Sequence, residues 1–118
     1  MAHQLTDEEV AALKGFRSVL TELLELRPNM PLHQAIVLVS VAIDEGHSQR
    51  EYGDFLGFQQ SMMSRAFLDC GPKTRKGEEG LGLIDLRRSM KSLRTYEIFL
   101  SIKGRALMKS IAKKLVRK

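Results

Sequence analysis

The sequence of 118 residues contains a single cysteine and no tryptophan, and it has no long uncharged apolar run. One thiol, Cys70, cannot form an internal disulfide bond and cannot build a zinc site by itself. The longest apolar stretch, from Leu32 to Ile43, is interrupted by polar side chains and is too short to span a membrane. Residues 1–9 also lack the basic start and apolar middle of a secretory signal peptide. We therefore expect a soluble, cytoplasmic protein.

The motifs of common enzyme and cofactor sites are also missing. The sequence has no glycine-rich phosphate-binding loop, no zinc-protease helix and no paired-cysteine motif. Its three histidines, His3, His33 and His47, have no metal-ligand spacing with carboxylates or with Cys70. Cys70 occupies an inward position of a predicted helix, which favours a small buried side chain over a redox sensor. We expect a protein that is not an enzyme and that uses no cofactor and no metal ion.

The composition is that of one soluble globular domain over residues 1–118, with 43% hydrophobic and 28% charged residues. The net charge of +5 is unevenly distributed. Residues 1–45 contain seven acids and three bases, whereas residues 46–118 contain sixteen bases and seven acids. This asymmetry indicates a polyanion as partner of the second half, with nucleic acid first among the candidates. A basic tail that only keeps the protein soluble is the alternative.

Two helices are predicted in the first part of the chain. Thr6 and Glu9 form a capping box, and apolar residues then recur at helical spacing as far as Arg27. The apolar face of this helix is broader than one small domain needs, so it is either core or an oligomer interface. A second, buried helix has Pro31 in its first turn and ends at Gly46, although its β-branched residues also permit a strand.

Two short helices joined by a glycine turn are predicted next, over residues 48–56 and 60–70. Ser48 and Glu51 form a second capping box at the start of the first helix. Gly53 provides the small residue that a close helix crossing needs, and Gly57 provides a turn residue that tolerates positive φ. The second helix has an inward apolar face, formed by Met63, Ala66, Phe67 and Cys70. Its outward face carries, at helical spacing, Ser61, Ser64, Arg65 and Leu68.

A β-hairpin and a final helix complete the pattern. A polar, glycine-rich loop over residues 71–80 precedes two short strands, predicted at 81–87 and 94–100, with a basic tip between them. Ser101 caps a last helix. Its apolar side carries Leu107, Met108, Ile111, Ala112, Leu115 and Val116. The predicted fold class is mainly α with a small β-hairpin (α+β), in the order α-α-α-α-β-β-α: a winged helix-turn-helix, with the helix-turn-helix at 48–70 and the wing at 81–100.

Several of these segments resemble the multiple antibiotic resistance regulator (MarR) family of bacterial DNA-binding proteins. Residues 48–65 are similar to the helix-turn-helix of that family, including the run QSMMSR at 60–65. The likeness returns in GLI at 82–84, in Arg94 of the wing and in LSIKGRAL at 100–107. The chain departs from the family pattern at Ser92 and Leu93, where members usually have Asp and Arg. The resemblance covers roughly residues 30–112 and implies a winged-helix DNA-binding protein of a bacterial or phage type.

The predicted recognition helix supplies the side chains that we expect to contact DNA bases or phosphates. Glutamine suits adenine, arginine suits guanine, serine suits either, and a methionine can touch a thymine methyl group. A solvated helix face is the alternative for these positions. The residues are Gln59, Gln60, Ser61, Met62, Ser64 and Arg65.

The wing supplies a second group of candidate residues, which we expect to grip phosphates or to enter the minor groove. They are Arg87, Arg88, Lys91 and Arg94. A hairpin that is merely solvated is the alternative. The loop residues Lys73, Arg75 and Lys76 either touch the DNA backbone or belong to a flexible linker.

The sequence therefore predicts a homodimeric transcription regulator that binds double-stranded DNA and acts as a repressor by occluding a promoter. The first and last helices would pair across a two-fold axis, and the recognition helices would enter successive major grooves about 34 Å apart. No residue pattern supports a small-molecule effector or a membrane partner. Two alternatives stay open: a winged-helix adaptor that binds another protein, and DNA binding in replication or partition.

Overall fold

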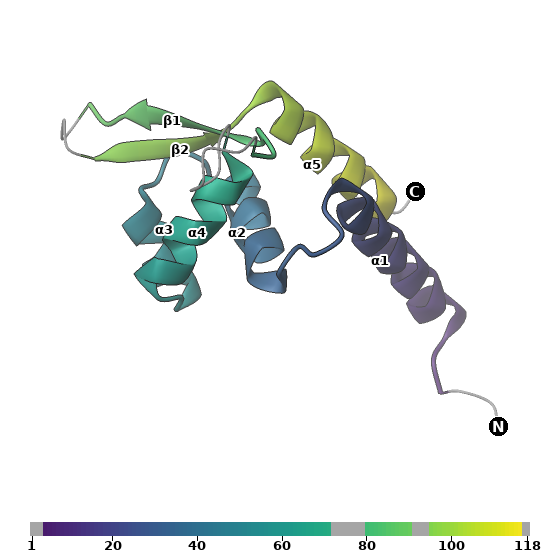
Figure 1. The fold of residues 1–118 in the computed structure, drawn as a ribbon. Helices are drawn as coiled ribbons and strands as arrows, with labels where there is room; N and C mark the ends of the chain where they lie inside the picture. Colours follow the sequence, from purple (N-terminus) through teal and green to yellow (C-terminus); the bar gives the residue numbers. More distant parts are fainter. Residues whose placement is uncertain (1–3, 72–79, 91–94, 117–118) are drawn as a thin grey trace. The chain divides into compact units, whose positions relative to one another are not determined.

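A computed structural model of the chain describes residues 4–71, 80–90 and 95–116 (Figure 1). These residues form helices and one antiparallel two-stranded sheet, in the order α-α-α-α-β-β-α. The fold class and the element order predicted from the sequence are thus confirmed. The elements are α1 (Asp7–Leu26), α2 (Leu32–Ile43), α3 (Gln49–Leu56), α4 (Gln60–Cys70), β1 (Ile84–Arg88), β2 (Tyr96–Leu100) and α5 (Ile102–Leu115).

The chain divides into two compact units. The smaller unit comprises residues 1–30 and 109–118, and it contains α1 and the second half of α5. The larger unit comprises residues 31–108, and it contains α2, α3, α4 and the hairpin. The expectation of one domain over the whole chain stays a prediction.

The long helix α1 of the smaller unit begins at the predicted capping box. The Oγ1 atom of Thr6 accepts the N–H of Glu9 at 3.1 Å, and the Glu9 carboxylate accepts the N–H of Thr6 at 2.8 Å. The helix ends at Leu26, with Arg27 in an extended conformation as its C-cap. The predicted limits of this helix are therefore confirmed.

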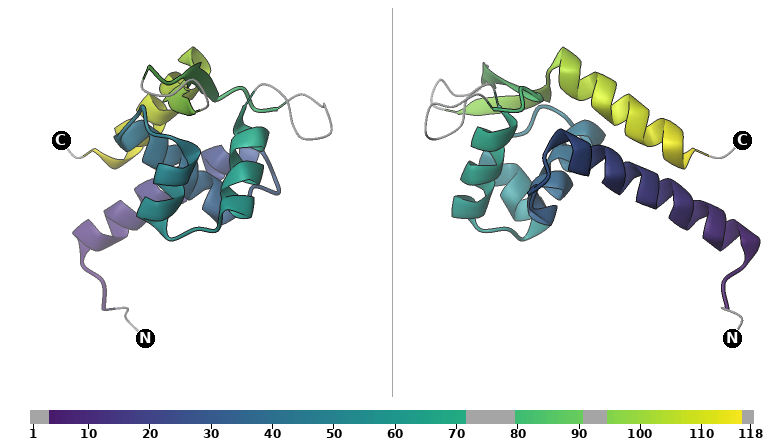
Figure 2. Two further views of the ribbon diagram at one scale, coloured as in Figure 1. Left: turned by 90° about the vertical axis from the view of Figure 1, so that its left-hand side faces the viewer. Right: turned by 45° about the vertical axis from the view of Figure 1, so that its right-hand side comes forward.

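Within the smaller unit, α1 runs antiparallel to the last turns of α5 (Figure 2). The carboxylate of Glu22 accepts hydrogen bonds from Ser110 Oγ at 2.8 Å and from Lys114 Nζ at 2.9 Å. These polar contacts lower the pKa of Glu22, with the Lys114 bond as the largest cause. The buried apolar side chains among the described residues of this unit are Val19, Leu23 and Ile111.

The core of the larger unit is formed by side chains from α2, α4 and the base of the hairpin. Those with at most 2% exposure include Val37, Leu38, Val41, Met63, Ala66, Leu83, Ile84 and Ile98. α2 is a helix, as predicted, and its β-branched residues fill this core instead of forming a strand. Burial of such side chains is the main source of stability for a unit of this size.

The limits of α2 differ slightly from the prediction. Pro31 is the N-cap and not a first-turn residue, because its ψ of 145° is extended while its carbonyl already accepts the N–H of Gln34 at 3.0 Å. At the other end the helix stops at Ile43, with Asp44 as C-cap. Gly46, with φ of 95°, turns the chain only after this point.

The hairpin pairs Ile84 with Leu100 at its base and Arg88 with Tyr96 toward its tip. β1 begins three residues later than predicted, because the preceding residues bond to the end of α4 instead of to β2. The N–H of Leu83 donates to the carbonyl of Cys70 at 2.7 Å, and residues 81 and 82 bond to Asp69 and Gly71 in the same way. The predicted alternation of faces in the second strand is confirmed.

A segment before α3 pairs with the free side of β2. The N–H of Gly46 donates to the carbonyl of Ile98 at 2.8 Å, and the N–H of Ile98 donates to the carbonyl of His47 at 2.9 Å. β2 is therefore bonded on both sides, to β1 and to residues 46–47. The wing is in this way fixed to the corner from which α3 starts.

Glu45 ties the same corner to the start of α5. Its carboxylate accepts the backbone N–H of Leu100 at 2.8 Å and the guanidinium of Arg105 at 3.0 Å. The Oγ atom of Ser101 accepts the N–H of Gly104 at 3.0 Å, which confirms Ser101 as the cap of the last helix. The helix-turn-helix, the wing and the first turns of α5 are thus joined by polar contacts.

Candidate nucleic-acid interface

The helix pair α3–α4 forms around two glycines. A Cβ atom on Gly53 would lie 2.5 Å from the Gln60 side-chain nitrogen and 3.2 Å from Met63 Cγ, so the two helices approach closely at this position. Gly57 is the C-cap of α3 and has φ of 71°, a conformation that favours glycine. Both roles that the sequence predicted for these glycines are confirmed.

The start of α3 is fixed by its own capping box. Ser48 Oγ accepts the N–H of Glu51 at 3.2 Å, and the Glu51 carboxylate accepts the N–H of Ser48 at 2.9 Å. The Ser48 hydrogen bonds are the largest influence on Glu51 and lower the pKa of its carboxyl. The cap sets where the first turn of α3 begins, and with it the positions of Gln49 and Arg50.

Helix α4 has one buried and one exposed face, as predicted. Its buried face consists of Met63, Ala66, Phe67 and Cys70. Its exposed side chains include five of the candidate residues, Gln60, Ser61, Ser64 and Arg65 on the helix and Gln59 at its N-cap, and Met62 is half-buried. The geometry thus leaves a row of polar side chains on the outside of this helix, available to a partner.

A groove of about 490 Å³, which we call the wing groove, lies between α4, the first turn of α3 and the hairpin. Gln60 and Ser64 line it from α4, Gln49 and Arg50 from α3, and Tyr96 from β2. Its floor is apolar and includes Phe67 and Ile98. The structure therefore brings two of the predicted recognition-helix residues together with wing residues.

The groove residues that sequence reasoning did not propose for binding include Gln49, Arg50 and Tyr96. The capping box at Ser48 could have placed the first two on the first turn of α3, because it fixes where that helix begins. No local signal placed Tyr96 beside α4, since that neighbourhood depends on the tertiary position of the hairpin.

The two wing arginines among the described residues each stack on an aromatic ring. The guanidinium carbon of Arg87 lies 4.2 Å from the ring centre of Phe99, and that of Arg88 lies 5.2 Å from the ring centre of Tyr96. Arg88 also donates a hydrogen bond to the Tyr96 hydroxyl at 3.1 Å. These contacts hold both cations at defined places on the hairpin. The other basic candidates, Lys91 and Arg94 of the wing and Lys73, Arg75 and Lys76 of the loop, lie outside the described residues.

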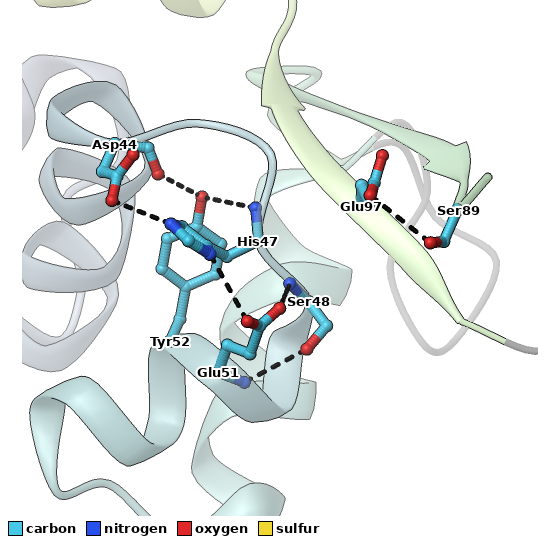
Figure 3. A network of polar contacts seen from close by, with 7 residues as sticks. All are labelled: Asp44, His47, Ser48, Glu51, Tyr52, Ser89 and Glu97. Atoms are coloured by element: carbon cyan, nitrogen blue, oxygen red, sulfur yellow. Dashed lines mark hydrogen bonds and ion pairs between the residues drawn. The ribbon is translucent and has the colours of Figure 1, made fainter. Parts of the chain in front are cut away.

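A cluster of polar side chains surrounds His47 at the corner before α3 (Figure 3). The imidazole lies between two carboxylates, with Nε2 2.8 Å from Asp44 and Nδ1 3.5 Å from Glu51. The hydrogen bond to Asp44 is the largest cause that raises the pKa of His47 above its ordinary value of 6.5. Beneath it, the buried Tyr52 hydroxyl donates to the carbonyl of Asp44 at 2.6 Å. The cluster therefore links the end of α2 to the start of α3.

The same cluster faces the wing across a small hollow of about 380 Å³. The wing side of this hollow carries Thr95, Ser89 and Glu97, and Ser89 donates a hydrogen bond to Glu97 at 3.4 Å. Figure 3 shows the Ser89–Glu97 pair on the hairpin, separate from the His47 network. Within the described ranges, no group of three or more potential metal-ligating side chains is found. Nor is any helix of the described part long and apolar enough to cross a membrane.

The smaller unit presents an apolar stripe along α1, which we call the α1 stripe. Its side chains are between 41% and 56% exposed and follow helical spacing. They are Leu13, Phe16, Leu20 and Leu24. Near the end of α5, Leu115 and Val116 are also exposed. Half of the apolar residues predicted for the broad face of the first helix are therefore exposed in the described part of the chain.

Comparison with solved structures finds close likenesses of fold. A MarR transcriptional regulator from Methanosarcina mazei Go1 matches 89% of this chain with a TM-score of 0.56 and 19% identity. The PcaV transcriptional regulator from Streptomyces coelicolor matches 93% with a TM-score of 0.60 and 19% identity. The transcriptional repressor CouR, solved with a 23-mer DNA duplex, matches 89% with a TM-score of 0.56 and 24% identity.

These likenesses identify the fold as a winged helix of the MarR type, as the sequence resemblance indicated. The chain spans 63% of the length of the M. mazei protein, 67% of CouR and 76% of PcaV. No protein-family model and no curated protein matches the sequence.

Proposed function

We propose that this chain binds double-stranded DNA and regulates transcription. The observation that carries the proposal is the exposed polar face of α4, which borders the wing groove next to a hairpin with two stacked arginines. A helix with one anchored apolar face and one polar face is suited to the major groove of DNA. The transcriptional repressor CouR, which has a similar fold, is solved bound to a 23-mer DNA duplex, and this supports DNA as the partner.

In this proposal α4 is the recognition helix. Gln60, Ser64 and Arg65 point away from the core and contact base edges or phosphates, and Gln59, Ser61 and Met62 flank them. Arginine pairs with guanine and glutamine with adenine through two hydrogen bonds, so Arg65 and Gln60 are the strongest candidates for specificity. Each such pair discriminates between bases by about 1–3 kcal/mol.

The wing contributes affinity in this proposal and α4 contributes specificity. Arg87, Arg88, Lys91 and Arg94 contact the phosphate backbone or the minor groove, because their charge neutralises phosphates without distinguishing bases. The affinity then falls steeply as the salt concentration rises, since bound counterions are released on binding.

We further propose that the chain acts as a homodimer, with the α1 stripe and the end of α5 at the interface. Exposed apolar side chains at helical spacing are typical of a face that a second helix covers. A dimer would present two copies of α4 to half-sites about 34 Å apart on a nearly palindromic DNA site. Occupancy of such a site within a promoter would exclude polymerase, so we propose repression as the outcome.

The proposal is tested by selecting DNA duplexes from a random pool with the purified full chain. The affinity for the selected duplex is then measured by titration. Arg65→Ala is expected to weaken binding about tenfold and to relax the preference at one base position. Arg17→Ala is the matched control, because it removes the same charge from an exposed position of α1 in the smaller unit. It is expected to leave both quantities unchanged.

The proposal fails if no duplex is enriched by the selection at low salt. The choice of α4 as the recognition helix fails if Arg65→Ala binds the selected duplex with the affinity and the base preference of the original chain.

One observation favours a second function, that of an adaptor which binds another protein. α2 presents four exposed apolar side chains at helical spacing, Leu32, Ile36, Val39 and Ile43. Light scattering with and without duplex DNA separates the two functions. A monomer that ignores DNA at low salt favours the adaptor, and a dimer that binds DNA favours the regulator.

A further inference from the structure

Arg88 and Tyr96 lie opposite each other across the hairpin, and their side chains make two contacts that strand pairing alone does not require. They are direct partners in the antiparallel register. The Arg88 guanidinium lies over the Tyr96 ring, at 5.2 Å from its centre, and also donates to its hydroxyl at 3.1 Å. One aromatic side chain thus contacts the cation through both its face and its polar end.

Such a pair restricts a long side chain that is otherwise free to rotate. An exposed arginine loses rotamer freedom when it binds a phosphate, and this loss weakens the contact. An arginine whose guanidinium is already held in one orientation against a ring loses less rotamer freedom when it binds a phosphate. A guanidinium presents its N–H groups in a planar fork, and this geometry matches two oxygens of a phosphate.

The location of the pair connects it to the candidate recognition helix. Side chains alternate along a strand, so Arg88 shares a face of the hairpin with Leu86, and Tyr96 shares that face with Ile98. Leu86, Tyr96 and Ile98 line the wing groove, opposite Gln60 and Ser64 of α4. Arg88 therefore lies at the outer end of the face that looks toward α4.

We propose that Tyr96 is a positioning residue that holds the Arg88 guanidinium for a phosphate of the DNA strand that passes along the wing groove. This inference rests on the proposed DNA-binding function and assigns within it a role to a residue that the sequence did not single out for binding. Tyr96 acts through Arg88, and its effect on affinity disappears when Arg88 is absent.

The experiment is a double-mutant cycle on affinity for the selected duplex, measured by fluorescence anisotropy with the full chain. Tyr96→Leu removes the ring and the hydroxyl but keeps an apolar side chain on the hairpin. It is expected to raise Kd about threefold, and Arg88→Ala about tenfold. The double variant is expected to match Arg88→Ala alone, because the Tyr96 side chain then has no guanidinium to position. Tyr96→Phe retains the ring and is expected to lie between the original chain and Tyr96→Leu.

Two further measurements distinguish positioning from a general structural role. Tyr96→Leu in an Arg87→Ala background is expected to show its full threefold effect, because Arg87 stacks on Phe99 and not on Tyr96. Arg88→Ala is expected to lower the slope of log affinity against log salt by about one unit, the amount for one phosphate contact. The melting temperature of each variant identifies any that are not folded at the temperature of the titration, and Tyr96→Phe then replaces Tyr96→Leu in the cycle.

The inference is overturned if the loss caused by the Tyr96 substitution is the same with Arg88 present and absent. It is also overturned if Arg88→Ala leaves Kd and the salt slope unchanged while Arg65→Ala weakens binding, a result that leaves the proposed function intact. If no duplex binds the original chain, the proposed function itself has failed.

Discussion

The two units of this protein differ in how completely they bury their own apolar side chains. In the larger unit Val37, Met63 and Leu83 are fully buried. In the smaller unit the buried apolar side chains of the described residues retain 6–7% exposure, and the α1 stripe is more than 40% exposed. Both units also expose apolar side chains, among them Leu32 and Ile43 of α2 in the larger unit, so the units differ in how completely their cores are buried and not in whether apolar surface is exposed. In the function proposed above, the larger unit binds DNA and the α1 stripe of the smaller unit associates with a second chain.

The largest expected effect is a difference in the free energy of unfolding between two leucine variants, one in each unit. Leu38→Ala, in the core of the larger unit, should lower the free energy of unfolding by about 3 kcal/mol, because it leaves a cavity at a residue with 1% exposure. Leu24→Ala on the α1 stripe removes the same atoms from a residue with 56% exposure. At protein concentrations low enough to keep the chain monomeric, it should cost less than about 0.5 kcal/mol. Urea unfolding of both variants measures the difference. Equal losses would show that the stripe is already buried within the monomer.

The next effect concerns the proposed association of two chains. Phe16→Glu combined with Leu20→Glu places charge on the α1 stripe and should convert a dimer to a monomer in sedimentation experiments. Affinity for a two-half-site duplex should fall about a hundredfold, because the second half-site no longer benefits from linkage. Lys14→Glu changes the net charge by the same amount on the same helix and is the control. An unchanged sedimentation coefficient would remove the stripe from the interface.

The smallest effect should come from the His47 cluster at the corner before α3. The pKa of His47 is raised in the folded chain, so its stabilising contribution is complete below pH 6.5 and is lost as the pH rises through the higher folded value. The pKa of Glu51 is lowered, so its contribution is complete above 4.5 and is lost as the pH falls. The carboxylates of Asp44 and Glu51 are both exposed, and ion pairs with exposed carboxylates stabilise a fold by about 0–1 kcal/mol.

His47→Gln should therefore flatten the upper part of the stability curve, above pH 6.5, and leave the acid side in place. The change is measured by melting temperatures recorded at pH values from about 5 to about 9, in steps of about one pH unit. Identical curves for the variant and the original chain would show that the imidazole does not stabilise the corner.

Local signals in the sequence predicted the helices of the larger unit well. The capping box of Ser48 and Glu51, the glycine turn at Gly57 and the inward positions of Met63 and Phe67 depend only on near neighbours in the chain. Each requires no knowledge of the tertiary arrangement, so each could be predicted from spacing alone.

Features that depend on distant parts of the chain could not be predicted in this way. The late start of β1 follows from hydrogen bonds between Leu83 and the end of α4. The place of Tyr96 in the wing groove follows from the position of β2 relative to α4. Sequence periodicity records which side of an element is apolar, but not which other element that side meets.

The anchoring of the wing to the corner before α3 has a consequence for the order in which the molecule can be completed. The bonds from Glu45 to Leu100 and Arg105 join residues 55 and 60 positions apart in the chain. During synthesis, α3 and α4 leave the ribosome whole, while the strand that completes their supporting corner is still to be translated. Long-range closures of this kind slow folding, so the nascent chain should spend an interval in which α3 and α4 are complete while the corner that supports them is not yet closed.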